Sequence, residues 1–126
     1  MKIPISIHLE KIVIKVTPTT RPIKDIVGFV EIEIEDNQGK VAFKVRGCTI
    51  RVKSFRNSPT FTVNAPAYKS GFGYKTSFII ENVTLWHEVE KIILQEFHEK
   101  NGGLSPEHYL NKEEDVNPDE LAKIFI

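Results

Sequence analysis

Apolar and polar residues alternate along the first third of the chain, which is the pattern of β-strands with one buried face. The alternation from Ile3 to Leu9 resumes in the opposite phase at Ile12, which predicts a first strand with a bulge near Lys11. Residues 17–22 hold two prolines and three threonines. This composition predicts a loop after the first strand.

A β-hairpin is predicted next. Residues 26–35 place alternate apolar side chains on one face, and the sequence Asp-Asn-Gln-Gly that follows is typical of a turn, so a third strand is expected directly after it. A turn of four residues would pair Ile34 with Val41 and would place Glu31 opposite Lys44. The first pair faces the core, and the second is a pair of opposite charges on the other face.

The third strand is predicted to contain a bulge and to lead into a fourth strand. Its inward-facing positions change from odd to even numbers near Gly47, where one extra residue fits. A turn over residues 56–59 then leads to a fourth strand over residues 60–64. In this register Val52 faces Val63.

One main helix is predicted after a long loop. Residues 65–75 are rich in glycine and aromatic residues and predict the loop, which a short strand over residues 76–80 follows. Thr84 is suited to cap a helix, and the Asn-Gly-Gly sequence at residues 101–103 is suited to end it. The apolar stripe of this helix consists of Leu85, Val89, Ile92, Ile93 and Phe97.

The chain is therefore expected to be an α+β protein, with an antiparallel sheet of four to five strands and the main amphipathic helix packed on one face of it. We expect the domain to span residues 1–103 and an acidic tail to span residues 104–126. Short helical pieces are expected in the tail at residues 105–108 and 117–120. The apolar tip at residues 121–126 predicts docking on the domain or a dimer mate, shielding of a basic surface, or recruitment of a protein partner.

Composition limits the class of protein. A chain of 126 residues with 40% hydrophobic residues builds one buried core. No run of about 18 apolar residues is present, so we expect a cytoplasmic protein that does not enter a membrane. Cys48 is the only cysteine, which excludes an internal disulfide and a thiolate metal cluster and fits a reducing compartment. We expect its side chain to be a small buried hydrophobe.

The net charge of zero hides a strong asymmetry along the chain. Residues 38–80 carry eight Lys and Arg and no acidic residue, whereas residues 81–126 carry four basic and eleven acidic residues. A segment of one sign and this length points to a polyanionic partner.

Patterns typical of enzymes are weak in this sequence. The acidic residues of the main helix fall on its solvated face, and the basic segment offers no carboxylate for acid-base chemistry. His87 and His98 are eleven residues apart, which does not fit a metal site on one helix face. Gly71 and Gly73 precede a predicted strand and not a helix, so no helix N-terminus would face a phosphate. We therefore expect a protein that binds and does not catalyse, without cofactor or metal.

Basic and aromatic residues are interleaved in the middle of the chain. Cations replace the counterions of a nucleic acid, and flat side chains stack on unpaired bases. In the expected register Arg51 and Lys53 face no acidic residue. The candidate nucleic-acid-binding residues are Arg46, Arg51, Lys53, Phe55, Arg56, Tyr68, Lys69, Phe72, Tyr74 and Lys75. The sequence does not distinguish DNA from RNA.

Two alternatives to nucleic-acid binding stay open. The same basic face could dock an acidic protein partner. The basic residues could also be only the solvated face of the sheet, with Phe72, Tyr74 and Phe78 in the core.

The order of these segments resembles the stage V sporulation protein G (SpoVG) family over roughly residues 5–100. The resemblance rests on the strand and turn at residues 26–39, the long strand at residues 43–52 with its Gly-Cys pair, and the strand that ends in a proline turn at residues 60–67. It continues through residues 74–98 to the end of the main helix.

This resemblance implies a small dimeric regulator that binds nucleic acid without a cofactor. A homodimer is also expected because an open strand edge is a template for pairing. The family places basic residues around and after the main helix, where this chain is acidic, so any nucleic-acid surface is expected on the sheet and on the loop after Asn64.

Overall fold

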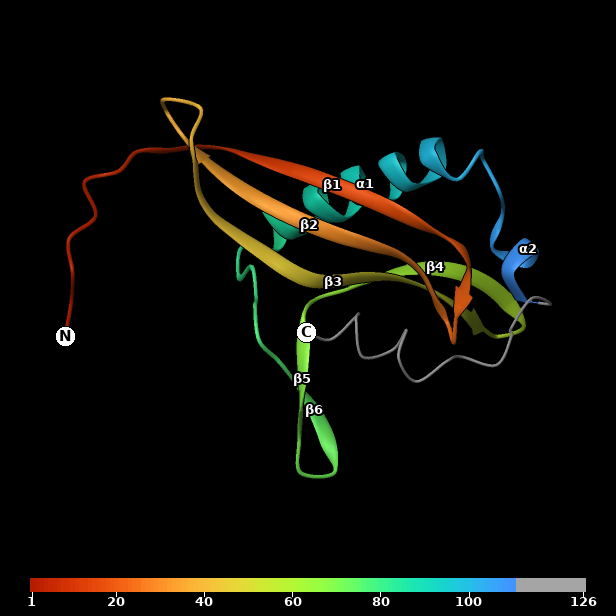
Figure 1. The fold of residues 1–126 in the computed structure, drawn as a ribbon. Helices are drawn as coiled ribbons and strands as arrows, with labels where there is room; N and C mark the ends of the chain where they lie inside the picture. Colours follow the sequence, from red (N-terminus) through yellow and green to blue (C-terminus); the bar gives the residue numbers. More distant parts are fainter. Residues whose placement is uncertain (111–126) are drawn as a thin grey trace.

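The computed structural model describes residues 1–110, and its main element is an antiparallel four-stranded sheet (Figure 1). The strands are β1 (Leu9–Ile23), β2 (Ile26–Asp36), β3 (Val41–Phe55) and β4 (Ser58–Asn64), adjacent in chain order. A separate hairpin and two helices follow: β5 (Ala67–Ser70), β6 (Gly73–Thr76), α1 (Val83–Lys100) and α2 (Pro106–Leu110). The predicted α+β class is confirmed. Within residues 1–110, neither helix has the length and apolar character needed to span a membrane.

The first strand begins and ends later than predicted, because β1 starts at Leu9 and residues 3–8 form no strand. β1 continues past Pro18 to Ile23, so the loop predicted at residues 17–22 is wrong. The register is irregular between Pro18 and Ile23, where the Thr19 hydroxyl donates a hydrogen bond to the carbonyl of Val27 (3.1 Å). β1 is the edge strand of the described sheet, and prolines are tolerated there because one side of the strand pairs with no other described strand.

The predicted bulge at Gly47 is confirmed, but the register of the hairpin is not. Val30 pairs with Cys48 and Ile32 with Val45, so β3 has one extra residue at this point, and Gly47 has a φ of +93°. A further irregularity near the start of β3 pairs Ile34 with Phe43, whereas Val41 was predicted. The β2–β3 pairing is irregular near both of its ends, between Ile26 and Gly28 and between Ile34 and Glu35. The alternation of apolar residues alone does not reveal these two irregularities.

The register of β3 with β4 also differs from the prediction. Phe55 pairs directly with Ser58 across a turn made by Arg56 and Asn57, whose φ angles are 50° and 63°. Val52 therefore faces Phe61 and not Val63. Two-residue turns of type I′ need two positive φ angles, and arginine gives no signal for such a conformation.

The segment after β4 is a hairpin and not a loop. β5 and β6 pair antiparallel and project from the sheet (Figure 1). The strand predicted at residues 76–80 is wrong, because β6 ends at Thr76 and no helix or strand covers residues 77–82. The aromatic residues that suggested a loop are also good strand formers, and their cross-strand pairing decides the outcome.

The main helix is confirmed, with a different cap. The side chain of Asn82, and not Thr84, accepts a hydrogen bond from the backbone N–H of Leu85 (3.0 Å). At the other end the backbone N–H of Asn101 donates to the carbonyl of Phe97 (2.8 Å), and Gly102 follows with a φ of +76°. The predicted stripe faces the sheet along most of its length, because Val89, Ile93 and Phe97 are buried.

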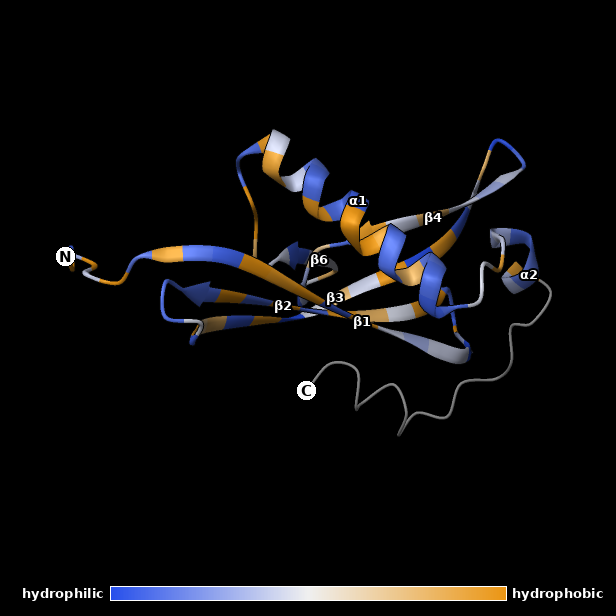
Figure 2. Cartoon of the chain, turned by 90° about the horizontal axis from the view of Figure 1, so that it is seen from above, coloured by the Kyte–Doolittle hydropathy of each residue, from blue (hydrophilic) through white to orange (hydrophobic). Residues whose placement is uncertain are grey.

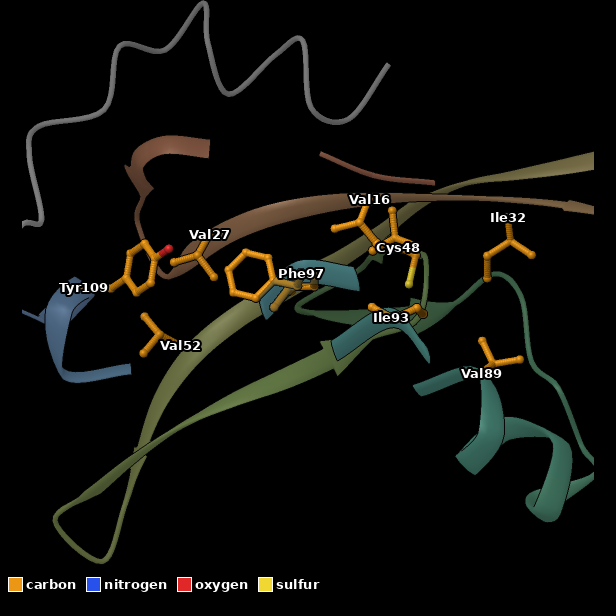
Figure 3. Packing of buried hydrophobic residues seen from close by; sticks show 11 residues of the cluster. Val16, Val27, Ile32, Cys48, Val52, Val89, Ile93, Phe97 and Tyr109 are labelled. Carbon is orange, nitrogen blue, oxygen red and sulfur yellow. The ribbon is translucent and has the colours of Figure 1, made fainter. Parts of the chain in front are cut away.

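The core lies between α1 and one face of the sheet (Figure 3). The ring of Phe97 packs edge-on against Phe61, with 5.0 Å between the ring centroids, and also contacts Tyr109 of α2. Gly28 of β2 makes room for it, since a Cβ atom there would lie 3.3 Å from the Phe97 ring. The short helix predicted near residue 106 thus completes the core. The predictions for residues 111–126 lie outside the described residues.

Candidate nucleic-acid interface

The face of the sheet opposite α1 carries an ordered set of ion pairs across β1, β2 and β3. Lys15 forms an ion pair with Glu33. The Lys44 Nζ lies 3.6 Å from a carboxylate oxygen of Glu31, and the Arg46 Nε donates to the other oxygen at 3.0 Å. The expected contact between Glu31 and Lys44 therefore exists, although the register places Glu33 directly opposite Lys44. This part of the face is close to electrically neutral.

Glu33 is a buried carboxylate in this set. The hydrogen bond from Lys15 lowers the pKa of Glu33 below its usual value, and the same contact raises the pKa of Lys15. Both shifts favour the charged pair in the folded protein. Glu33 therefore stabilises the fold in its ionised form.

We expect this contribution to depend on pH. Because the pKa of Glu33 is lowered on folding, its stabilising effect is complete above the usual pKa near 4.5 and is lost as the pH falls through the lowered value. The difference in Tm between the wild type and Glu33→Gln should be largest near pH 7 and should shrink toward pH 3. Glu35→Gln is the matched control, since Glu35 forms no ion pair within the described part of β1–β4. A Tm difference that stays constant with pH would contradict this role.

Arg51 has an acidic partner, contrary to the sequence prediction. Its Nη1 donates to the Oδ1 of Asp25 at 2.6 Å, and the carbonyl of Asp25 accepts from the backbone N–H of Val52 at 2.9 Å. Asp25 precedes the first residue of β2, and Ile26 pairs with Arg51, so the register brings the two charges together. The sequence-based prediction placed Arg51 opposite residues of β4 and did not include the β1–β2 turn, where Asp25 lies. Arg51 is half-buried and ties the β1–β2 turn to β3.

A groove of about 1270 Å³ lies between this open face of the sheet and the β5–β6 hairpin. We call it the hairpin groove. Its lining contains the cations Lys15, Lys24, Arg46, Arg51 and Lys53 and the single carboxylate of Glu31. Aromatic and uncharged polar lining residues are Phe29, Tyr74, Thr17, Thr49, Asn64 and Ser77. The groove thus combines positive charge, aromatic rings and hydrogen-bonding groups.

The hairpin carries an aromatic residue beside a lysine on each of its two faces. Tyr68 pairs with Lys75, and Lys69 pairs with Tyr74. Because paired residues of an antiparallel hairpin lie on the same face, each face presents one ring and one cation. Tyr74 belongs to the face that lines the groove. Lys69 therefore lies on the groove side, and Tyr68 and Lys75 lie on the other.

The aromatic candidates are all exposed. The exposed fractions are 67% for Phe55, 52% for Tyr68, 112% for Phe72 and 74% for Tyr74. The alternative that Phe72 and Tyr74 belong to the core is therefore wrong. Exposed aromatic residues that cluster on one side of a protein commonly mark a binding surface.

The structure divides the candidate residues into two clusters. Phe55 and Arg56 form the β3–β4 turn, where the guanidinium carbon lies 5.4 Å from the centre of the Phe55 ring. The hairpin follows the opposite end of β4, a strand of seven residues, so the hairpin lies about 20 Å from this turn. Arg51, Lys53, Lys69 and Tyr74 belong to the groove cluster, whereas Tyr68 and Lys75 lie on the face of the hairpin that points away from the groove.

Several groove residues were not predicted from the sequence. Lys24 lies in the β1–β2 turn, and Phe29, Thr49 and Asn64 belong to three different strands. Phe29 alone had a usable signal, since it continues the outward-facing positions of Glu31 and Glu33 along β2. The others are brought into the groove only by strand pairing.

The described residues offer little for metal or nucleophilic chemistry. Within residues 1–110, no three His, Cys, Asp or Glu side chains gather as a metal site would require. Burial raises the pKa of the Cys48 thiol to about 12, so this side chain stays neutral at physiological pH.

Comparison of the chain with models of protein families, with curated proteins and with solved structures finds no match. The resemblance to the SpoVG family therefore stays a prediction.

Proposed function

We propose that this protein binds single-stranded or locally open nucleic acid in the hairpin groove, as a regulator without catalytic activity. The observation that carries the proposal is the groove lining, in which five cations and two aromatic rings surround one carboxylate. A strand of nucleic acid needs positive charge for its phosphates and flat side chains for its bases. The groove supplies both on one surface.

The cations available to phosphates are mainly lysines. Lys15, Arg46 and Arg51 already have carboxylate partners. Four lysines near the groove have no ion pair with another described residue: Lys24, Lys53, Lys69 and Lys75. These side chains are exposed and give the groove and hairpin a positive field.

The aromatic side chains favour single strands over duplexes. Unpaired bases present their faces for stacking, which contributes about 1–3 kcal/mol per base, whereas the bases of a duplex are already stacked on one another. Tyr74 in the groove and Tyr68 and Phe72 on the hairpin are exposed for such contacts. Phe55 and Arg56 offer a second contact about 20 Å away along β4.

The test is the affinity for labelled single-stranded DNA and RNA oligonucleotides at 50 to 300 mM salt, measured by fluorescence anisotropy. With four lysines on phosphates, the logarithm of the affinity should fall with the logarithm of salt with a slope of about −3. Tyr74→Ala should weaken binding about 5- to 150-fold through lost stacking, and Tyr74→Phe should keep most of the affinity.

Polyglutamate is the control that separates the alternative function. A protein that docks acidic partners would bind polyglutamate as tightly as the oligonucleotides, and Tyr74→Ala would affect both equally. Absence of oligonucleotide binding at 50 mM salt would overturn the proposed function.

A further inference from the structure

The apolar stripe of α1 is not covered along its whole length. Leu85, Val89, Ile93 and Phe97 follow one another at steps of four residues and share one side of the helix. Leu85 is 37% exposed, whereas the other three are at most 3% exposed. Figure 2 shows α1 and the sheet diverging toward the end of the helix that carries Leu85. The core is thus open at this end of the described chain.

The sheet is also uncovered at this end. Phe43 pairs with Ile34, whose side chain packs at the border of the core, so Phe43 lies on the same face as the core. Phe43 is 47% exposed and Leu9 is 45% exposed. We call Leu9, Ile34, Phe43 and Leu85 the distal patch. It continues the hydrophobic core beyond the residues that fill it.

The segment at residues 1–8 has the sequence of a strand but no strand partner within the described chain. Ile3, Ile5 and Ile7 alternate with other residues and are exposed. The last contact with the sheet is the hydrogen bond from the Asn37 N–H to the carbonyl of His8 (3.0 Å), one residue past the end of β2. From there the segment runs away from the sheet (Figure 1).

The segment does not reach the distal patch of its own chain. Leu9 is both the first residue of β1 and a member of the patch, so the segment would have to reverse direction at His8 to cover it. The residues around His8 contain no glycine or proline that favours such a reversal. Within residues 1–110, the chain therefore carries an uncovered apolar patch and, pointing away from it, an uncovered apolar segment.

We propose that a second copy of this chain covers the distal patch with its N-terminal segment, and that the exchange is reciprocal. Among the described strands β1 pairs only with β2, so its outer edge has backbone groups for an added strand beside Leu9. A two-fold axis lets each segment fill the patch of the other copy and closes the assembly as a dimer. The eight segment residues and the four patch residues give 12 contact residues per copy, fewer than the roughly 20–30 residues per partner of a standard interface, so pairing along the outer edge of β1 has to add to the contact.

Sedimentation at tens of micromolar protein tests the assembly. The wild type should be a dimer, and both removal of residues 2–7 and Phe43→Asp should give folded monomers. Phe55→Asp is the matched control, because Phe55 is an exposed phenylalanine of the same strand at its opposite end, and this variant should stay a dimer. Circular dichroism shows whether each variant is folded.

Disulfide formation identifies the contact without disturbing the patch by a charge. In a Cys48→Ala background, Ile5→Cys and Leu85→Cys are placed on separate chains and mixed under mild oxidation. A covalent dimer that forms faster in the mixture than in either variant alone supports the proposal. A monomeric wild type, a dimer that survives both changes, or a disulfide that forms only when both cysteines are on one chain would overturn it. None of these readouts depends on nucleic acid.

Discussion

The variant Lys24→Ala/Lys53→Ala/Lys69→Ala is expected to bind single-stranded oligonucleotides about 100-fold more weakly than the wild type at 0.1 M salt. Each phosphate contact to a single strand contributes a slope of about −0.7 in the dependence of log affinity on log salt, and three lost contacts give about two powers of ten at 0.1 M. The salt slope itself should decrease by about 2. Fluorescence anisotropy over a salt series measures both quantities.

This loss should come from the surface and not from the fold. All three lysines are exposed and have no ion pair with another described residue, so the free energy of unfolding should change by less than about 0.5 kcal/mol per substitution. The matched control is Lys11→Ala/Lys40→Ala/Lys91→Ala, which removes the same charge from exposed positions that do not line the groove. Equal loss of affinity in the two variants would mean that only net charge matters and that the groove is not the site.

Phe97→Ala is expected to have the largest effect on stability, a loss of about 3–5 kcal/mol in the free energy of unfolding. The Phe97 side chain is 1% exposed, and its ring contacts Phe61 and Tyr109 across the interface of α1, β4 and α2. Its removal leaves a cavity where three elements meet, next to Gly28, which has no side chain to fill it. A loss of this size should lower the Tm by more than about 10 °C in thermal unfolding followed by circular dichroism.

Ile92→Ala is the control for this prediction, because Ile92 belongs to the same predicted stripe but is 45% exposed. It removes three side-chain carbons, against six in Phe97→Ala, and because its position is exposed it should lower the Tm by no more than a few degrees. If the two variants had equal effects, the packing of α1 on the sheet through Phe97 would be wrong.

One face of the sheet packs into the core and contributes to stability, whereas the opposite face carries the proposed binding groove. α1 and α2 cover one face and form the core, as Figure 3 shows for Phe97, Ile93 and Tyr109. The opposite face and the β5–β6 hairpin stay open and carry the groove. Substitutions in the groove can therefore change binding while the core stays intact, which makes the lysine variants informative.

The sequence by itself determined the elements and the faces of this protein. The alternation in residues 26–35 reports which side chains of β2 face the core, and the four-residue spacing from Val89 to Phe97 reports which side of α1 does so. The change of phase at Gly47 revealed a bulge, which has a positive φ in the structure. These signals are local, because each depends on the backbone geometry of one element and on the burial of one face.

Only the tertiary structure decided which residues meet. The two-residue turn at Arg56 and Asn57 and the irregularity before Phe43 each shift a strand register by two residues, and such a shift keeps every side chain on its predicted face. The alternation of apolar residues therefore gives no sign of a two-residue shift in register. The ion pair of Arg51 with Asp25 and the assembly of the groove from four strands and a hairpin depend on this register. The sequence predicted the basic and aromatic residues, and strand pairing determined which of the cations have carboxylate partners.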